Sequence, residues 1–382
     1  MIIGFDTLGE NPNSPTSAIN YLTEFVDFFS EKDEHIILLF GSKKNKKYFK
    51  ISQNIKFINC HFSNENVIGR ILVQQILIPF YLKIYGANIL FSPLNSTSLL
   101  TRVPIFLKVN TLHHLHFDSN KNQNIKTKIV DSLRKFYRHI FFDLSIRKAS
   151  KIIANTNYTK NEIVNHYNIK SDKVHVIMEA YANDFGKYDK SFSKDYVKNN
   201  FGINYDYIIY PASFWDYKNH RGALESFNIL KKVDKSRIKL LFVGRDEENI
   251  KKEILQKSRK YGIEDSIKFL DFVQIEEIVH LVNASKVLFF PSKMETFGKP
   301  IVEAMISKTP IVGSNNSSIP ELVSKDDYLC SPENYQCFAK KLHLLINQED
   351  KNYIENNFHK ANDFSYKNSF ENLNTQFNKI LS

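Results

Sequence analysis

Residues 287–305 combine the residue types needed to bind an anion that also carries hydroxyl groups. They predict a buried strand, a loop that holds Glu295, and a helix with Pro300 in its first turn, where the missing N–H of proline is not needed. Gly298 lets the backbone approach a ligand closely, and the amides and dipole at the helix start favour a diphosphate. Carboxylates accept hydrogen bonds from hydroxyls, so Glu295 and Glu303 are suited to grip diols on either side. An ordinary strand–loop–helix with two solvated glutamates is the alternative.

The elements that must position these residues follow from the hydrophobic pattern. Short β-rich apolar runs alternate with longer helical patterns along almost the whole chain, which predicts βαβ units and parallel sheets. Helices are expected at 16–29, 66–83 and 158–167, among strands at 1–5, 35–40, 56–59, 88–91, 105–109, 151–154 and 174–177. A second strand series is expected at 207–210, 239–243, 267–269, 286–290 and 310–312.

The polar segment 183–202 separates the two series, so the predicted fold class is α/β, with two Rossmann-like domains facing a cleft. The expected domains are residues 1–185, which would bind an acceptor, and residues 186–360, which would bind the ligand of the 287–305 segment. Residues 361–382 are expected to form a C-terminal helix that can pack back on the first domain.

The stretch Glu295-Thr-Phe-Gly-Lys-Pro-Ile-Val-Glu303 resembles the Glu–x7–Glu donor motif of family 4 glycosyltransferases, which are retaining enzymes of the GT-B fold. The resemblance covers residues 207–335 well and the first half of the chain more weakly. Further matching pieces occur in the family's order, namely Tyr210–His220, Leu241–Gly244, Phe269–Val273, Pro310-Ile-Val-Gly-Ser and Pro320-Glu321.

The resemblance implies roles for the residues of the motif itself. Glu303 would accept hydrogen bonds from ribose hydroxyls, and Glu295 would contact the hydroxyls of the transferred sugar and support its reacting face. Backbone N–H groups around Phe297, Gly298 and Lys299 would bind the sugar and the diphosphate.

Other donor-binding residues follow from the neighbouring pieces. Lys218 would neutralise the departing diphosphate, and the backbone near Gly244 and Val273 would flank the base. The family often has Gly-Arg where this chain has Ala212-Ser213, so Lys218 would carry more of the phosphate charge, or Arg245 would help. Asp271 also replaces a common glycine. An exposed loop lysine is the alternative for Lys218.

The first half offers one catalytic candidate. The strand at 105–109 runs into His113 and His114, which resembles the family's strand ending in His-Asp, where the histidine lies beside the reacting carbon. Packing or surface polarity is the alternative for such a pair. Thr156 stands where the family has a serine, although helix capping is the simpler interpretation. The paired glycines of the family's first loop are absent from Gly9–Pro15, and no site is assigned there.

The charge is uneven. The chain of 382 residues has a formal charge of +11, and residues 1–185 hold 23 Lys and Arg against 15 Asp and Glu. A basic first half suggests an anionic partner, such as a phosphorylated acceptor or an acidic membrane surface, although nucleic acid fits the sign equally well. Residues 124–149 predict a basic amphipathic helix that either lies on an acidic membrane or packs on its own sheet.

The three cysteines are too few and too scattered for a disulfide framework, so Cys60, Cys330 and Cys337 are expected to be buried thiols of a reducing compartment. No pattern predicts a signal peptide, a transmembrane helix or a metal site. A cytoplasmic location, with peripheral contact to the acidic inner face of the membrane, is expected.

The expected activity is therefore retaining transfer of a hexose from a nucleotide-sugar, with GDP-mannose favoured and a UDP-sugar open, to a glycan or lipid-linked acceptor of surface polysaccharide synthesis such as O-antigen. The expectation includes no cofactor, no metal and no nucleic acid. Two alternatives are a nucleotide-sugar epimerase of the same architecture and a basic nucleic-acid-binding protein, which a pI near 9.2 favours.

Overall fold

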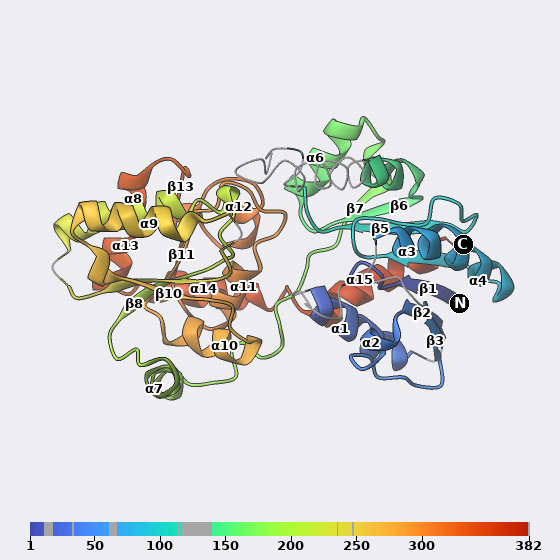
Figure 1. Ribbon diagram of the computed structural model, residues 1–382, viewed down its shortest axis with the longest axis horizontal. Coiled ribbons are helices and arrows are strands. Elements are labelled where there is room, and N and C mark those ends of the chain that lie inside the picture. The colour runs from blue at the N-terminus through green and yellow to red at the C-terminus, as the bar shows by residue number, and fades with distance from the viewer. Residues whose placement is uncertain are drawn as a thin grey trace. The chain divides into compact units, whose positions relative to one another are not determined.

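The computed structural model describes residues 1–10, 18–32, 34–60, 67–112, 115, 140–234, 236–246 and 248–380. The chain divides into two compact units (Figure 1). Unit 1 comprises Met1–Met178 and Tyr366–Ser382, and unit 2 comprises Glu179–Ser365. The divisions fall near the positions 185 and 360 at which the sequence pattern changes. Each unit is built around its own parallel sheet.

In the described part of unit 1, seven strands pair in the order β3-β2-β1-β4-β5-β6-β7. They are β1 (Ile2–Asp6), β2 (Ile36–Gly41), β3 (Ile55–Asn59), β4 (Ile89–Ser92), β5 (Ile105–Val109), β6 (Lys151–Ala154) and β7 (Val174–Val176). The helical segments are α1 (Ala18–Ser30), α2 (Lys43–Lys46), α3 (Val67–Leu72), the π-helical η1 (Val73–Leu77), α4 (Ile78–Ile84), α6 (Asn157–Tyr167) and α15 (Tyr366–Asn378).

In unit 2, six strands pair in the order β10-β9-β8-β11-β12-β13 over the residues described. They are β8 (Tyr207–Pro211), β9 (Lys239–Val243), β10 (Ile267–Leu270), β11 (Val287–Phe290), β12 (Ile311–Ser314) and β13 (Leu329–Cys330). The main helices are α7 (Lys190–Phe201), α8 (His220–Val233), α9 (Ile250–Tyr261), α10 (Ile275–Ala284), α11 (Lys299–Ile306), α12 (Ile319–Leu322), α13 (Tyr335–Asn347) and α14 (Lys351–Ala361). The strands are almost continuous apolar runs, as a sheet covered on both faces requires.

The polar segment 183–202 contains a helix that its composition did not indicate. Helix α7 packs on α10, where the Tyr196 ring stacks on the His280 ring with centroids 4.0 Å apart. The hydroxyl of Ser193 lies 3.1 Å from Nδ1 of the same histidine. These contacts make α7 part of unit 2.

The cysteine expectation is wrong for two of the three residues. Cys330 at the end of β13 and Cys337 in the first turn of α13 form a disulfide, with Cα atoms 6.0 Å apart. The sequence pattern did not predict β13, and without that strand nothing placed the two cysteines face to face. The disulfide removes the argument for a reducing compartment that rested on these residues. Cys60 is a buried free thiol.

Among the described residues, no helix has both the length and the apolar character that crossing a membrane requires.

The C-terminal helix α15 completes the core of unit 1, beside α1 (Figure 1). Phe370 lies against Tyr21 and Phe25, with ring centroids 5.2 Å and 5.6 Å apart. Phe377 packs edge-on against Phe106 of β5, with centroids 4.8 Å apart, and is fully buried. The last helix of the chain is therefore a structural part of the first unit.

Phe377→Ala should destabilise unit 1 by about 3–5 kcal/mol, because it removes a fully buried aromatic ring and leaves a cavity. Urea unfolding, monitored by hydrogen exchange resolved to peptides, should show a lower free energy of unfolding in unit 1 and little change in unit 2. Asn378→Ala, at the exposed neighbouring position, is the matched control. A change in stability that is equal in the two variants would contradict this role of α15.

Candidate functional site

The candidate site of unit 2 lies at the carboxyl edge of its sheet. Successive strands run outward from β8 to β9 and β10 in one direction, and from β11 to β12 and β13 in the other. The order therefore reverses between β8 and β11, where the loops after the two strands diverge. Parallel sheets bind ligands at such a switch point. Lys218 follows β8 and Glu295 follows β11, so the fold brings both predicted residues to this place.

Lys218 and Glu295 form an ion pair across the switch point. The lysine Nζ lies 2.7 Å from Oε1 of Glu295, and the two side chains are only 16% and 10% exposed. Burial alone lowers the pKa of Lys218, but the Glu295 carboxylate outweighs it and the pKa is raised above the ordinary value. The lysine therefore stays protonated. The alternative of an exposed loop lysine is wrong.

The loop after β8 is fixed by its neighbours. The Tyr210 hydroxyl donates a hydrogen bond to the carbonyl of Lys218, and the N–H of Lys293 donates to the carbonyl of Tyr217 over 2.8 Å. Asn219 has a φ of 60° and caps α8 with its side-chain oxygen. The side-chain amide nitrogen (Nδ2) of Asn219 donates to the carbonyls of Pro291, at 3.0 Å, and Pro332, at 2.9 Å.

The loop after β11 is held by the loop after β12. The N–H of Glu295 donates to the Ser317 hydroxyl at 2.8 Å, and the Ser318 hydroxyl donates to the carbonyl of Phe297 at 2.6 Å. The Phe297 ring is buried against Phe364, with centroids 5.8 Å apart. Phe297 can therefore offer a ligand only its backbone.

Gly298 directly precedes α11 with a φ of 109°, a conformation that favours glycine. A side chain there would also meet Leu322, whose Cδ1 lies 3.3 Å from the position of a Cβ atom. Pro300 occupies the first turn as expected, and the N–H of Ile301 donates to the carbonyl of Gly298. The positive end of the helix dipole thus lies at the loop that contains Glu295.

Glu303 belongs to a second group of charges, one turn into α11. Burial raises the pKa of Glu303 to about 7, Lys299 opposes this rise and Glu179 adds to it. Lys299 pairs with Glu179, with Nζ 2.9 Å from Oε1 and side chains 19% and 12% exposed. The sequence analysis missed Glu179, because no spacing rule relates it to a helix more than a hundred residues later.

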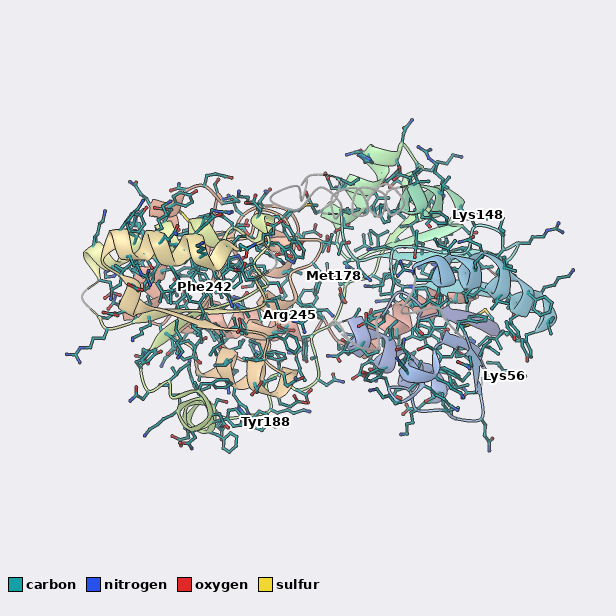
Figure 2. The ribbon with its side chains drawn as sticks, in the orientation of Figure 1. Lys56, Lys148, Met178, Tyr188, Phe242 and Arg245 are labelled. Carbon is teal, nitrogen blue, oxygen red and sulfur yellow. A yellow bond between two sulfur atoms is a disulfide. The ribbon has the colours of Figure 1, made fainter. Side chains whose placement is uncertain are left out.

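The ends of β9 and β10 provide the other predicted residues. A Cβ atom at Gly244 would lie 2.3 Å from the carbonyl oxygen of Ala212, so only glycine fits where β9 passes the end of β8. The Arg245 guanidinium lies over the Phe272 ring, 4.5 Å from its centroid, and Val273 is half-buried beside it in sequence. Figure 2 labels Arg245 and also Phe242, which is buried three residues earlier in β9.

Asp271, which replaces a common glycine, points its carboxylate to Lys251 of α9. The Lys251 ion pair lowers the pKa of this carboxyl group. The aspartate that departs from the family pattern at this position is thus paired with a nearby lysine.

In unit 1, the predicted His113 and His114 lie outside the described residues, and so does most of the segment 124–149. The described residues just before the histidines are tightly organised. Asn95 accepts a hydrogen bond from the N–H of Asn110 at 2.7 Å, and Asn110 donates to the carbonyl of Pro93 at 2.6 Å. Thr156 caps α6 by accepting from the N–H of Thr159, which confirms the capping interpretation.

Two family models match the chain. "Glycosyltransferase Family 4" matches residues 31–179, and "Glycosyl transferases group 1" matches residues 192–361. Together they cover most of the chain and divide it where the structure does.

Several similar proteins with known names are mannosyltransferases. The chain is 24% identical over 220 residues to the serotype-specific mannosyltransferase WbdA of Escherichia coli, covering 57% of this chain and 27% of WbdA. It is 24% identical to O-antigen chain mannosyltransferase B of Escherichia coli over 59% of each chain. It is 23% identical over 350 residues to the α-1,3/1,6-mannosyltransferase ALG2 of Dictyostelium discoideum, covering 84% of this chain and 83% of ALG2. The matched region thus spans about a quarter of WbdA and three fifths of mannosyltransferase B.

Solved structures share the fold over the whole length. A glycosyltransferase from Rickettsia africae matches with a TM-score of 0.71 and 17% identity, covering 100% of this chain and 98% of that one. Anabaena Alr3699/HepE, solved with UDP and glucose, matches with a TM-score of 0.70 and 17% identity over 99% of each chain. The two parallel-sheet units are those of the GT-B fold. With a family 4 domain followed by a group 1 domain, this chain belongs to the glycosyltransferases.

Proposed function

We propose that the chain transfers a hexose, with mannose favoured, from a nucleotide-sugar to a glycan or lipid-linked acceptor in surface polysaccharide synthesis, with retention at the anomeric carbon. The observation that carries the proposal is the buried Lys218–Glu295 pair at the switch point of unit 2, next to the start of α11. Mannose is supported by the mannosyltransferases among the relatives, and an O-antigen-like acceptor by the name of O-antigen chain mannosyltransferase B.

The diphosphate of the donor would bind at the start of α11. A lysine ammonium has three N–H donors, and Glu295 engages one of them, so Lys218 can also donate to phosphate oxygens. The helix dipole adds a positive potential at the same place. As the bond between the sugar and the diphosphate breaks, negative charge grows on the leaving oxygen, and these fixed groups stabilise it. Our proposal assigns this role to the protein alone, with no metal and no cofactor.

Glu295 would hold the sugar. The backbone N–H of Glu295 donates to the Ser317 hydroxyl and one carboxylate oxygen accepts from Lys218, so the residue is held in place and its second carboxylate oxygen can accept from sugar hydroxyls. Glu303 would accept from the ribose hydroxyls one turn further along α11. We assign neither glutamate the acid or nucleophile role of a glycoside hydrolase, and the retention that we propose involves no covalent sugar–enzyme intermediate. The base would lie along Gly244 and Val273, with Arg245 near the phosphates, and His113 would lie beside the reacting carbon.

The enzyme is expected to work at the inner face of the cytoplasmic membrane, where lipid-linked acceptors are assembled. The basic first half of the chain supports this placement.

The proposal is tested by incubating the protein with a panel of nucleotide-sugars and lipid-linked or glycan acceptors, and by reading the product with proton NMR. We expect transfer from one donor, GDP-mannose first, and an anomeric configuration equal to that of the donor. A product of inverted configuration would contradict the retaining assignment. Epimerised or free sugar formed equally well without any acceptor would instead favour the epimerase alternative.

Lys218→Ala should lower turnover by a factor of about 10²–10³, because a fixed charge that stabilises the leaving group is lost. Initial rates at saturating donor measure the effect. Lys257→Ala is the control, since it breaks a more exposed lysine–glutamate pair, formed by Lys257 of α9 and Glu225 of α8. Lys218→Ala should also melt at a lower temperature, because it leaves the Glu295 carboxylate unpaired, so the rates are compared at a temperature at which both variants remain folded. A wild-type rate for Lys218→Ala would end the assignment.

Donor affinity should rise as the pH increases through about 7. Burial raises the pKa of Glu303 to about 7, and we expect the ionised form to accept the ribose hydroxyls. Protonation then competes with binding, so the affinity for an intact nucleotide-sugar should increase about tenfold between pH 6 and pH 8. Titration calorimetry measures it, and Glu303→Gln should bind weakly with no such dependence. An equal pH dependence in Glu303→Gln would assign the effect to another group.

The same pKa has a consequence for stability. Because the folded-state pKa of Glu303 lies above the usual value, its protonated form favours the fold, and that contribution is lost as the pH rises towards 7. Glu303→Gln should therefore be more stable than the wild type above pH 7, while the two converge near pH 4.5. Thermal melts across this range provide a check on the fold that does not depend on a ligand.

A further inference from the structure

Segments α3, η1 and α4 form one continuous helical stretch that lies over the sheet of unit 1. Its inner face is buried through Val73, Ile78 and Leu82. The contact with the sheet is close, since a Cβ atom at Gly4 of β1 would lie 2.4 Å from Cδ2 of Leu82. The helix is therefore firmly placed, and its opposite face points away from the core.

That outer face is apolar where a surface helix is normally polar. Five large apolar side chains are between 39% and 58% exposed, namely Leu72, Ile76, Leu77, Phe80 and Ile84. A helix that is apolar all round is ordinarily buried, in a protein core or in lipid. Contiguous exposed apolar surface marks a contact site for a protein or a membrane. We call these five residues the outer stripe.

The geometry of the helix keeps the outer stripe straight. Leu72, Ile76, Phe80 and Ile84 are spaced by four residues, which in an α-helix of 3.6 residues per turn drifts steadily around the axis. The π-helical segment η1 has wider i→i+5 turns, which offset this drift in the middle of the stripe. One edge of the helix thus presents a continuous apolar ridge.

The loop beside the helix extends the apolar surface. The Gln75 side chain accepts from the N–H of Leu99 at 2.7 Å and donates to the carbonyl of Thr97 at 3.2 Å. Leu100 follows directly and is 66% exposed. The N–H of Thr97 also donates to the Ser145 hydroxyl, which joins the helical residues 140–148 to the same loop.

The charges of the chain segment that carries the outer stripe have one sign. Residues 66–117 contain no aspartate and no glutamate, whereas Lys83 and Arg102 are exposed beside the apolar residues. The Lys56 ammonium lies 4.0 Å from the ring centroid of Tyr85, one residue after the end of α4. Figure 2 labels Lys56 and Lys148, and both side chains are exposed on unit 1.

An apolar ridge that is flanked by cations, on a segment without carboxylates, matches an anionic lipid surface. The apolar side chains enter the boundary between headgroups and acyl chains, and lysine and arginine contact the anionic headgroups. A second copy of the chain is a poorer match, because a symmetric contact would bring the same cations together. We infer that the outer stripe of α3, η1 and α4 docks unit 1 on an anionic membrane, which presents the lipid-linked acceptor of the proposed reaction to this unit. The inference rests on the proposed function only for that acceptor.

The test is sedimentation of the full chain with vesicles of neutral phospholipid, with and without an anionic phospholipid such as phosphatidylglycerol. We expect the wild type to sediment with the anionic vesicles and to be released by salt. Phe80→Glu should weaken this binding at least tenfold, because it removes an inserted ring and adds a charge of the wrong sign. Lys83→Glu should weaken it less, and mainly at low salt.

Phe192→Glu is the matched control, since Phe192 of α7 in unit 2 has almost the same exposure as Phe80, 54% against 55%. It should bind vesicles as the wild type does. Wild-type protein that stays in the supernatant, or a Phe80→Glu variant that sediments normally, would overturn the inference. So would a wild-type dimer in sedimentation equilibrium that Phe80→Glu converts to a monomer, because the stripe would then bind a second copy.

Nucleotide-sugar binding measured without vesicles separates this inference from the proposed function. Phe80→Glu should retain wild-type donor affinity and a wild-type melting temperature. A wild type that binds no nucleotide-sugar would count against the proposed function alone. A wild type that binds no vesicles would count against the docking role of the outer stripe alone.

Discussion

Unit 2 depends on a positive and a negative charge being held together largely out of water at the point where its sheet reverses direction. Removing two charges from water is unfavourable, and losing one partner of such a pair costs about 3–5 kcal/mol. The Lys218–Glu295 pair is therefore stable only if both loops are fixed closely. Hydrogen bonds donated by Tyr210 and Asn219 and accepted by Ser317 do this, and each of these residues lies in a neighbouring strand end or loop. A pre-positioned cation next to a helix start is what a departing diphosphate needs.

The same constraint explains features that look unrelated in the sequence. Asn219 takes up a left-handed conformation so that its side chain can both cap α8 and bind the carbonyls of Pro291 and Pro332. Pro332 lies inside the short loop that the Cys330–Cys337 disulfide closes. Asn219, the neighbour of Lys218 in sequence, therefore links the Lys218–Glu295 pair to the loop that the disulfide closes, although the disulfide lies at the edge of the sheet. Glycine is required at position 244 because a side chain there would collide with the backbone of Ala212, and it is favoured at position 298 by a positive φ.

The sequence predicted the architecture because its physical signal is strong and local. Buried parallel strands are continuous apolar runs, and every predicted strand appears within one or two residues of its expected position. Strand β13 was missed because two residues make no pattern, and α7 was missed because its polar face dominates its composition. The disulfide was missed along with β13.

The site was predicted residue by residue but not in its pairing. Lys218 and Glu295 were assigned to different parts of the ligand, and only the three-dimensional structure shows that they contact each other. Glu179 and the raised pKa of Glu303 depend on tertiary burial, which spacing does not encode. The sequence predicted the helix over 66–83 that carries the outer stripe, but packing decides whether its apolar residues face the core or water.

The most direct measurement of the central claim is a crystal structure of the protein with its nucleotide-sugar or the matching nucleoside diphosphate. Our account predicts phosphate oxygens within hydrogen-bond distance of the Lys218 ammonium and of the backbone at the start of α11, with ribose hydroxyls on Glu303. A nucleotide bound away from α11, with the Lys218–Glu295 pair unchanged and closed to the ligand, would contradict it.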